Sequence, residues 1–170
     1  MKSLAVFEAI VRATKNVGEA HSIGAQVSVH PFDERNIHPD ISKVSLKLFD
    51  NGHYSHATFE AFKLIDNRVK KISGVKDTGF SLMMTAFDPK TPRIQLNELQ
   101  SMSDTDEQLG FRHVFAGSMS GIRNPRGHDN EIDRPDTIDL CLDHLSMASV
   151  LLRTLENRKL PSPQSQAAGA

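Results

Sequence analysis

The segment from Gly121 to His128, which reads GIRNPRGH, gathers residue types that suit metal-independent cleavage of RNA. Arg123 supplies a planar, permanently charged fork for two phosphate oxygens, and Asn124 can hydrogen-bond a ribose, a phosphate or an imidazole ring. His128 carries the side chain best suited to moving protons at neutral pH. Such a cleavage needs a base to activate the 2′-hydroxyl, a cation to steady the phosphorane and an acid to protonate the leaving oxygen.

The spacing of this segment leaves a second interpretation open. In an unbroken helix Arg123 and His128 would point about 140° apart, because successive side chains rotate by about 100°. Pro125 cannot continue the backbone hydrogen bonds, so we expect the helix to kink or end near Arg123 and Asn124, and Gly127 helps to make a different geometry possible. The alternative is that Arg123 merely caps a helix C-terminus and His128 is an ordinary polar loop residue.

Helical periodicity recurs along most of the chain and predicts an all-α fold. The expected helices cover residues 1 to about 18, 39 to 50, 53 to 73, 103 to about 124, and 135 to 160. A chain of 170 residues has room for one domain with a genuine core. We expect an N-terminal helix and connector in residues 1–35, a helical domain in residues 36–158, and a disordered, low-complexity tail in residues 159–170.

The composition restricts the partners and the compartment. The formal charge is -1, from 20 basic and 21 acidic residues, so any contact with nucleic acid must be local. The single cysteine, Cys141, cannot form an internal disulfide, and we expect it to be a buried structural thiol. No run approaches the roughly 18 apolar residues of a membrane span. We therefore expect a cytoplasmic protein without a membrane segment.

Polar residues of the helix expected at 53 to 73 are further candidates, because they form a stripe opposite a broad apolar face. Glu60 and Asn67, seven residues apart on that stripe, would line the same cleft as the motif and orient its side chains; the alternative is a solvated helix face. His53 and His56, with Glu60 one turn on, could bind a transition metal from one face. They lack a second cluster of ligands, so we expect neither a metal ion nor a cofactor.

Basic side chains near the motif are candidates for a surface that contacts RNA. They are Lys63, Arg68, Lys70, Lys71, Arg112 and His113. Exposed lysines and arginines on helices more often serve only to keep a protein in solution, and the neutral charge balance favours that alternative.

The motif and its surroundings resemble a known group of proteins. Arg123 and His128, with four residues between them and a polar residue directly after the arginine, resemble the R-x4-6-H motif of the HEPN superfamily. The wider sequence is similar to the Ymh-type family in the stretches GHYSHATFEAFKLIDNRV, SLMMTAF, DEQLGF, FAGSMSGIRNPRGH and ASVLLRTL. The likeness covers about residues 36 to 156.

This resemblance implies an HEPN-like helical bundle with an additional N-terminal helix, and a homodimer in which two Arg-x4-His motifs face one another. It also implies metal-independent endoribonuclease activity, in a toxin or effector of toxin–antitoxin, abortive-infection or anti-phage defence systems, with an antitoxin or defence-system protein as partner. Arg123 would contact the phosphate, Asn124 would orient the site and His128 would transfer the proton. Arg126, at a variable interior position, would support substrate binding.

Two other classes of function fit the same sequence. The first is a non-catalytic helical module that binds RNA, a nucleotide or a partner protein through the same cleft. The second is a structural subunit of a larger assembly, indicated by Gly117 and Gly121, which leave one helix face without side chains and suit close packing within the chain or across a dimer. The sequence has no Gly-rich phosphate loop and no recognisable serine nucleophile motif, so nucleotide hydrolysis and acyl transfer are not expected.

Overall fold

The computed structural model of the chain describes residues 29–128 and 135–159. The chain divides into two units, residues 1–30 and residues 31–170, and the helices below belong to the second unit. The helix expected at residues 1 to 18 lies outside the described residues, as does nearly all of the tail expected from residue 159 onward.

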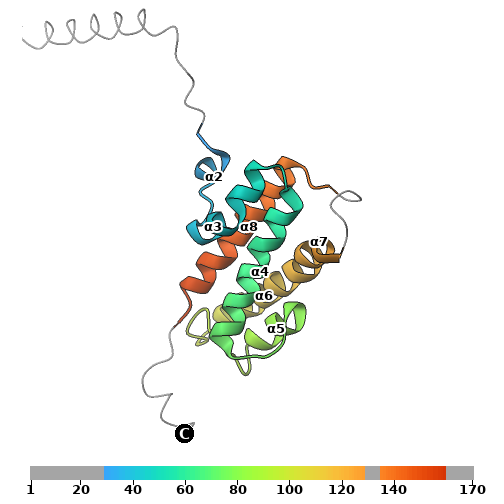
Figure 1. Cartoon of the computed structure of the whole chain (residues 1–170). Helices are drawn as coiled ribbons and strands as arrows, with labels where there is room; N and C mark the ends of the chain where they lie inside the picture. The colour runs from blue at the N-terminus through green and yellow to red at the C-terminus, as the bar shows by residue number, and fades with distance from the viewer. Residues whose placement is uncertain (1–28, 129–134, 160–170) are drawn as a thin grey trace, which may run out of the picture. The chain divides into compact units, whose positions relative to one another are not determined.

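The second unit is helical throughout its regular parts, and residues 29–128 and 135–159 contain no strand. Its elements are α2 (Pro31–Glu34), α3 (Pro39–Asp50), α4 (Tyr54–Ser73), α5 (Gly79–Ala86), α6 (Met102–Ser118), the π-helical segment η1 (Met119–Arg123), α7 (Asn124–His128) and α8 (Ile138–Glu156) (Figure 1). The all-α fold predicted from the sequence is confirmed. None of the described helices is long and apolar enough to cross a membrane.

Helix α4 lies at the centre of this bundle, since it contacts α3, α5, η1, α7 and α8 (Figure 1). The side chains of α4 that are completely buried are Ala57, Thr58, Ala61, Phe62, Ile65 and Val69. Their spacing of three and four residues is that of one helix face, and the leucines of α8 cover it. The polar stripe predicted for the opposite side of α4 is mostly exposed to solvent. Helix α4 thus has one face in the core and one at the surface, and it also contacts η1 and α7.

Helix α6 begins at a capping box. The Ser101 hydroxyl accepts a hydrogen bond from the Asp104 backbone N–H at 3.0 Å, and the Asp104 carboxylate accepts one from the Ser101 backbone N–H at 3.3 Å. The hydrogen bond from the Gln100 backbone, followed by that from Ser101, lowers the pKa of Asp104. The start predicted from the sequence was Ser103, two residues after the actual N-cap. The acidic residues that follow Ser103 also fit the pattern of a helix start, in which a serine cap precedes acids in the first turn.

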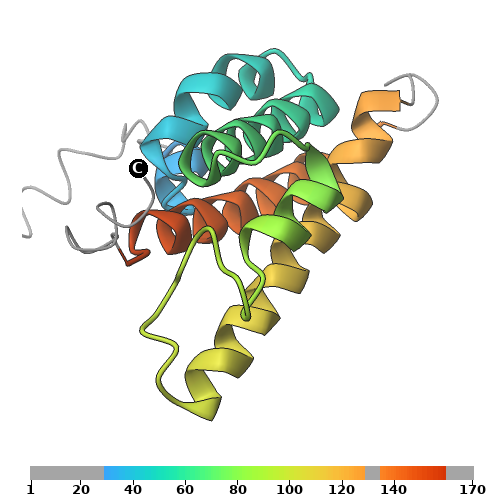
Figure 2. The same cartoon turned by 90° about the horizontal axis from the view of Figure 1, so that it is seen from below.

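The helix that carries the motif is distorted near Arg123 but does not end there. It widens into η1, in which the Asn124 backbone N–H donates to the Met119 carbonyl, and it continues as α7 (Figure 2). Pro125 lacks an N–H, and its ring would clash with the carbonyl of Gly121 in a regular α-helix. A π-turn shifts that carbonyl and relieves the clash. Of the two predicted outcomes, a kink or an end near Arg123 and Asn124, the helix thus shows a local distortion and continues.

The glycine face of α6 and η1 is open. A side chain added at Gly117 or at Gly121 would meet nothing within 4 Å, and both residues are exposed. Close packing within the chain, one of the two uses predicted for this face, is therefore absent from the part of the chain that the structure describes.

Candidate functional site

Arg123, the last residue of η1, lies against the ring of Phe59 on α4. The guanidinium carbon is 5.4 Å from the ring centroid, within the range of a cation–π contact. Its Nη1 donates to the Asn124 Oδ1 at 3.2 Å. The Nε atom is buried and has no hydrogen-bond partner among the described residues. Arg123 is thus half-buried and oriented by a ring and an amide, with hydrogen-bond donors still unused.

Lys63 and Glu60 extend the same surface along α4. The Lys63 Nζ lies 5.8 Å from the centroid of the Phe59 ring, and it also pairs with the Glu60 Oε1 at 3.0 Å. Two cations therefore contact one aromatic ring, with a carboxylate beside them. Glu60, predicted to orient the motif, lies one residue from Phe59 and is joined to Lys63 rather than to Arg123 or His128.

The other end of the motif also reaches Phe59. A Cβ atom at Gly127 would lie only 2.8 Å from the ring's Cε2, so only glycine allows the backbone of α7 to approach the ring this closely. His128 follows as the last residue of α7; it is exposed, with no ion pair or hydrogen bond to any described residue. The structure thus brings both ends of the motif to one ring, Arg123 through its side chain and His128 through its neighbour.

Arg126, predicted to bind substrate or to have a supporting role, forms a buried ion pair with Asp136. Its Nε and Nη2 donate to the Asp136 carboxylate at 2.5 Å and 2.7 Å, and its Nη1 donates to the Ile122 carbonyl at 2.8 Å. The two side chains are only 11% and 4% exposed. The backbone N–H of Asp136 in turn donates to the hydroxyl of Ser55 on α4 at 3.3 Å. Arg126 therefore supports the motif by fastening α7 to the start of α8, and not as a free phosphate ligand.

The remaining sequence candidates lie farther from the motif. Asn67 is exposed and eight residues beyond Phe59, about 12 Å along the helix axis. Arg68 and Arg112 of the proposed basic surface pair with Asp40 at 2.6 Å and Asp88 at 2.8 Å. Of the basic candidates, Lys63 is the one that contacts the ring beneath Arg123.

The histidines at the start of α4 lie near each other, with the ring centroids of His53 and His56 6.2 Å apart. Both are exposed, and Glu60, the third member of the sequence candidate, pairs with Lys63. These three residues therefore do not form a closed set of ligands.

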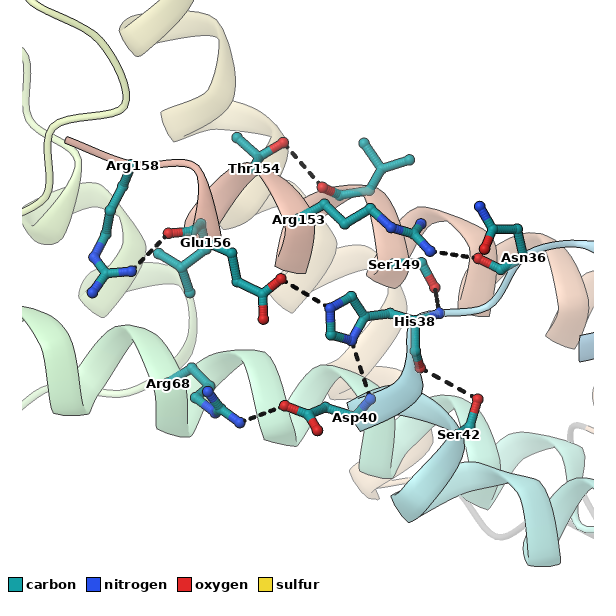
Figure 3. Close-up of polar contacts among 12 residues, drawn as sticks. Asn36, His38, Asp40, Ser42, Arg68, Ser149, Arg153, Thr154, Glu156 and Arg158 are labelled. Atoms are coloured by element: carbon teal, nitrogen blue, oxygen red, sulfur yellow. Dashed lines mark hydrogen bonds and ion pairs between the residues drawn. The ribbon is translucent and has the colours of Figure 1, made fainter. Parts of the chain in front are cut away.

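A polar cluster that sequence reasoning missed joins α3 to α8 (Figure 3). One ligand atom from each of His38, Asp40 and Glu156 falls within 4.8 Å of the others, as a metal site would require. The His38 Nδ1 accepts the Asp40 backbone N–H at 3.1 Å, however, and its Nε2 faces the Glu156 Oε2 at 2.9 Å. A backbone N–H can only donate, so Nδ1 holds the lone pair and Nε2 carries the proton that Glu156 accepts.

This tautomer gives His38 no nitrogen lone pair for a metal ion. The carboxylate of Asp40 is also satisfied, by Lys43 and Arg68, each at 2.6 Å, and the hydrogen bond from Lys43 lowers its pKa. The cluster in Figure 3 is therefore a set of structural hydrogen bonds and ion pairs that joins the start of α3 to the end of α8. The sequence signal that could have found it is the histidine directly before Pro39, at a helix N-cap.

Two titratable groups of α8, the buried Cys141 and the partly buried His144, lie near the ion pair of Arg126. Burial raises the pKa of the Cys141 thiol to about 11, and the Thr58 hydroxyl donates to its sulfur at 3.6 Å. Burial also lowers the pKa of His144, as does the nearby Arg126 guanidinium. Cys141 is fully buried, which confirms the expected structural thiol.

The raised pKa of Cys141 predicts a loss of stability in alkali. The folded state holds the thiol proton more tightly than the unfolded state, so this contribution to stability is complete below about pH 9 and is lost as the pH rises towards about 11. Urea unfolding across this window should show a steeper loss for the parent than for Cys141→Ser, which does not ionise. Parallel curves for the two proteins would contradict the prediction.

A comparison with known proteins agrees with the likeness of sequence. No curated protein and no solved structure gives a significant match to the chain. A family model described as "Protein of unknown function (Hypoth_ymh)" matches residues 35–155, which include the whole surface around Phe59 and most of α8. The chain therefore belongs to the Hypoth_ymh family.

Proposed function

We propose that the protein is a metal-independent endoribonuclease of the HEPN superfamily, and that Arg123, Asn124 and His128 form its active site. The observation that carries this proposal is the contact of the Phe59 ring with the Arg123 guanidinium and with the backbone at Gly127, the residue before His128. Arg123 offers a cation with unused hydrogen-bond donors, and His128 offers an exposed imidazole. RNA cleavage by the 2′-hydroxyl requires these two kinds of group, one to stabilise the phosphorane and one to transfer protons.

In the proposed reaction the 2′-oxygen attacks the adjacent phosphorus and the bond to the 5′-oxygen breaks. The products are a 2′,3′-cyclic phosphate and a free 5′-hydroxyl. The imidazole of His128 transfers protons, taking one from the 2′-hydroxyl or giving one to the 5′-oxygen. The guanidinium of Arg123 binds the phosphorane oxygens, and Asn124 holds that guanidinium through the contact at 3.2 Å.

We also propose that the active form is a homodimer in which two motifs face one another. Two copies would bring two His128 imidazoles to one phosphate, so that one can act as base and the other as acid. The open glycine face of α6 and η1 offers room for a close contact between helices of two copies. We further propose a cytoplasmic toxin or effector role in toxin–antitoxin, abortive-infection or anti-phage defence, with a partner protein that restrains it.

The test is an assay of the purified full chain on total RNA with excess EDTA. We expect cleavage that EDTA does not inhibit, cyclic phosphate at the new 3′-ends, and no cleavage of DNA of matched sequence, which lacks the 2′-hydroxyl. Binding of RNA without cleavage would reject the nuclease and favour the non-catalytic module. Cleavage that EDTA abolishes would reject the mechanism.

A further inference from the structure

Phe59 is a poor candidate for a simple core residue. Its neighbours Thr58 and Phe62 are completely buried, whereas Phe59 remains half-exposed at the edge of the apolar face of α4. The contacts of its ring are the guanidinium of Arg123, the ammonium of Lys63 and the backbone at Gly127. A partly exposed ring in contact with two cations is placed to hold their side chains.

The contact with the ring fixes a side chain that would otherwise be mobile. Arginine has many rotamers, and ordering it on a surface costs conformational entropy. Here the buried Nε lacks an acceptor among the described residues, so the main attraction on this part of Arg123 comes from the negative face of the ring. The Nη1 contact with Asn124 fixes the rotation of the guanidinium plane.

The backbone at Gly127 also limits where the ring can lie. A methyl group at this position would lie 2.8 Å from Cε2, so an alanine would force the ring to move. The ring therefore contacts both the Arg123 guanidinium and the α7 backbone at Gly127.

From these contacts we propose that Phe59 is a positioning residue for the active site: its ring holds the Arg123 guanidinium in place for the phosphorane. This role rests on the proposed function of Arg123. Because Phe59 would act through Arg123 in the transition state, its loss should lower kcat and leave KM nearly unchanged.

The experiment compares Phe59→Leu, which keeps an apolar side chain but loses the ring, with Phe59→Tyr, which retains the ring. We expect Phe59→Leu to lower kcat by about 5- to 30-fold, in line with the strength of a partly desolvated cation–π contact, and Phe59→Tyr to restore most of the activity. The matched control is Phe80→Leu on α5, where the phenylalanine is 50% exposed and lines a different part of the surface, with Asp88 and Arg112.

A second readout does not depend on activity. In the NMR spectrum of the full chain, the Arg123 Nε–H signal, assigned by its loss in Arg123→Lys, should be shifted by the ring current and protected from exchange with water. Phe59→Leu should abolish the shift and the protection, and Phe59→Tyr should keep both. An unchanged signal in Phe59→Leu would overturn the proposal, as would unchanged kcat in a parent that cleaves RNA.

The two readouts separate the failure of this proposal from that of the proposed function. A parent that cleaves RNA while Phe59→Leu remains fully active rejects only the role of Phe59. A parent that cleaves no RNA but shows the shifted Arg123 signal rejects the nuclease, and with it a catalytic purpose for the contact, while the contact itself stands.

Discussion

Replacement of His128 by alanine is expected to lower the rate of RNA cleavage by about 10²- to 10⁴-fold, the usual contribution of a general acid or base. The side chain is exposed and bonds to no described residue, so its removal should change the free energy of unfolding by only about 0.5 kcal/mol or less. Arg123→Ala should cost a comparable factor, because it removes the cation that stabilises the phosphorane. Arg123→Lys should restore little, since an ammonium cannot replace the planar fork.

Initial rates in EDTA, with thermal unfolding of each variant alongside, would measure these effects. His53→Ala is the matched control, because it removes an exposed histidine outside the motif and should cleave at the parental rate. If His128→Ala folds normally and cleaves as fast as the parent, the proton-transfer role of His128 is wrong.

Breaking the ion pair between Arg126 and Asp136 is expected to destabilise the fold most. Arg126→Met leaves a carboxylate that is only 4% exposed without its partner and removes a donor from the Ile122 carbonyl. Loss of one partner from a buried pair typically costs about 3–5 kcal/mol, because the remaining charge stays desolvated. Asp136→Leu should be similarly destabilising, and the double variant should be less so than the two single losses combined.

Urea unfolding would provide the measurement, and Arg68→Met is the control. Arg68 also donates to an aspartate, Asp40, but its side chain is 43% exposed, so we expect a cost of about 1 kcal/mol or less. A cost that small for Arg126→Met would show that water reaches the pair. At a temperature where Arg126→Met remains folded, kcat close to the parental value would agree with a supporting role, and a loss as large as that of Arg123→Ala would indicate direct contact with substrate.

Much of the bundle could be predicted from local signals in the sequence. Helices α3 and α4 begin and end within about a residue of the expected positions. Pro39 suits the first turn of α3, and Gly74 takes the left-handed conformation that ends α4. The last helix was expected from Pro135, but Thr137 caps it and its first residue is Ile138. The apolar run after Gly79 forms α5, a short helix that periodicity alone did not assign.

The arrangement of the site could not be predicted in the same way. The π-turn lies just before Pro125 and packs against α4. Helical periodicity predicts where a helix runs, but it does not predict a local change in the number of residues per turn. Phe59 lies between the apolar face and the polar stripe of α4, so its spacing predicts neither burial nor a contact with Arg123. His38 and its partner Glu156 are 118 residues apart in the sequence, and Asp136 follows its partner Arg126 by ten residues. Such pairs exist only after the chain has folded.

The ion pair of Arg126 and Asp136 also changes what the chain can tolerate beside its motif. It joins α7 directly to the segment before α8, through two residues that are ten positions apart in the sequence. As long as Arg126 and Asp136 are both kept, changes to the residues between them should therefore leave α7, and with it Arg123, in place.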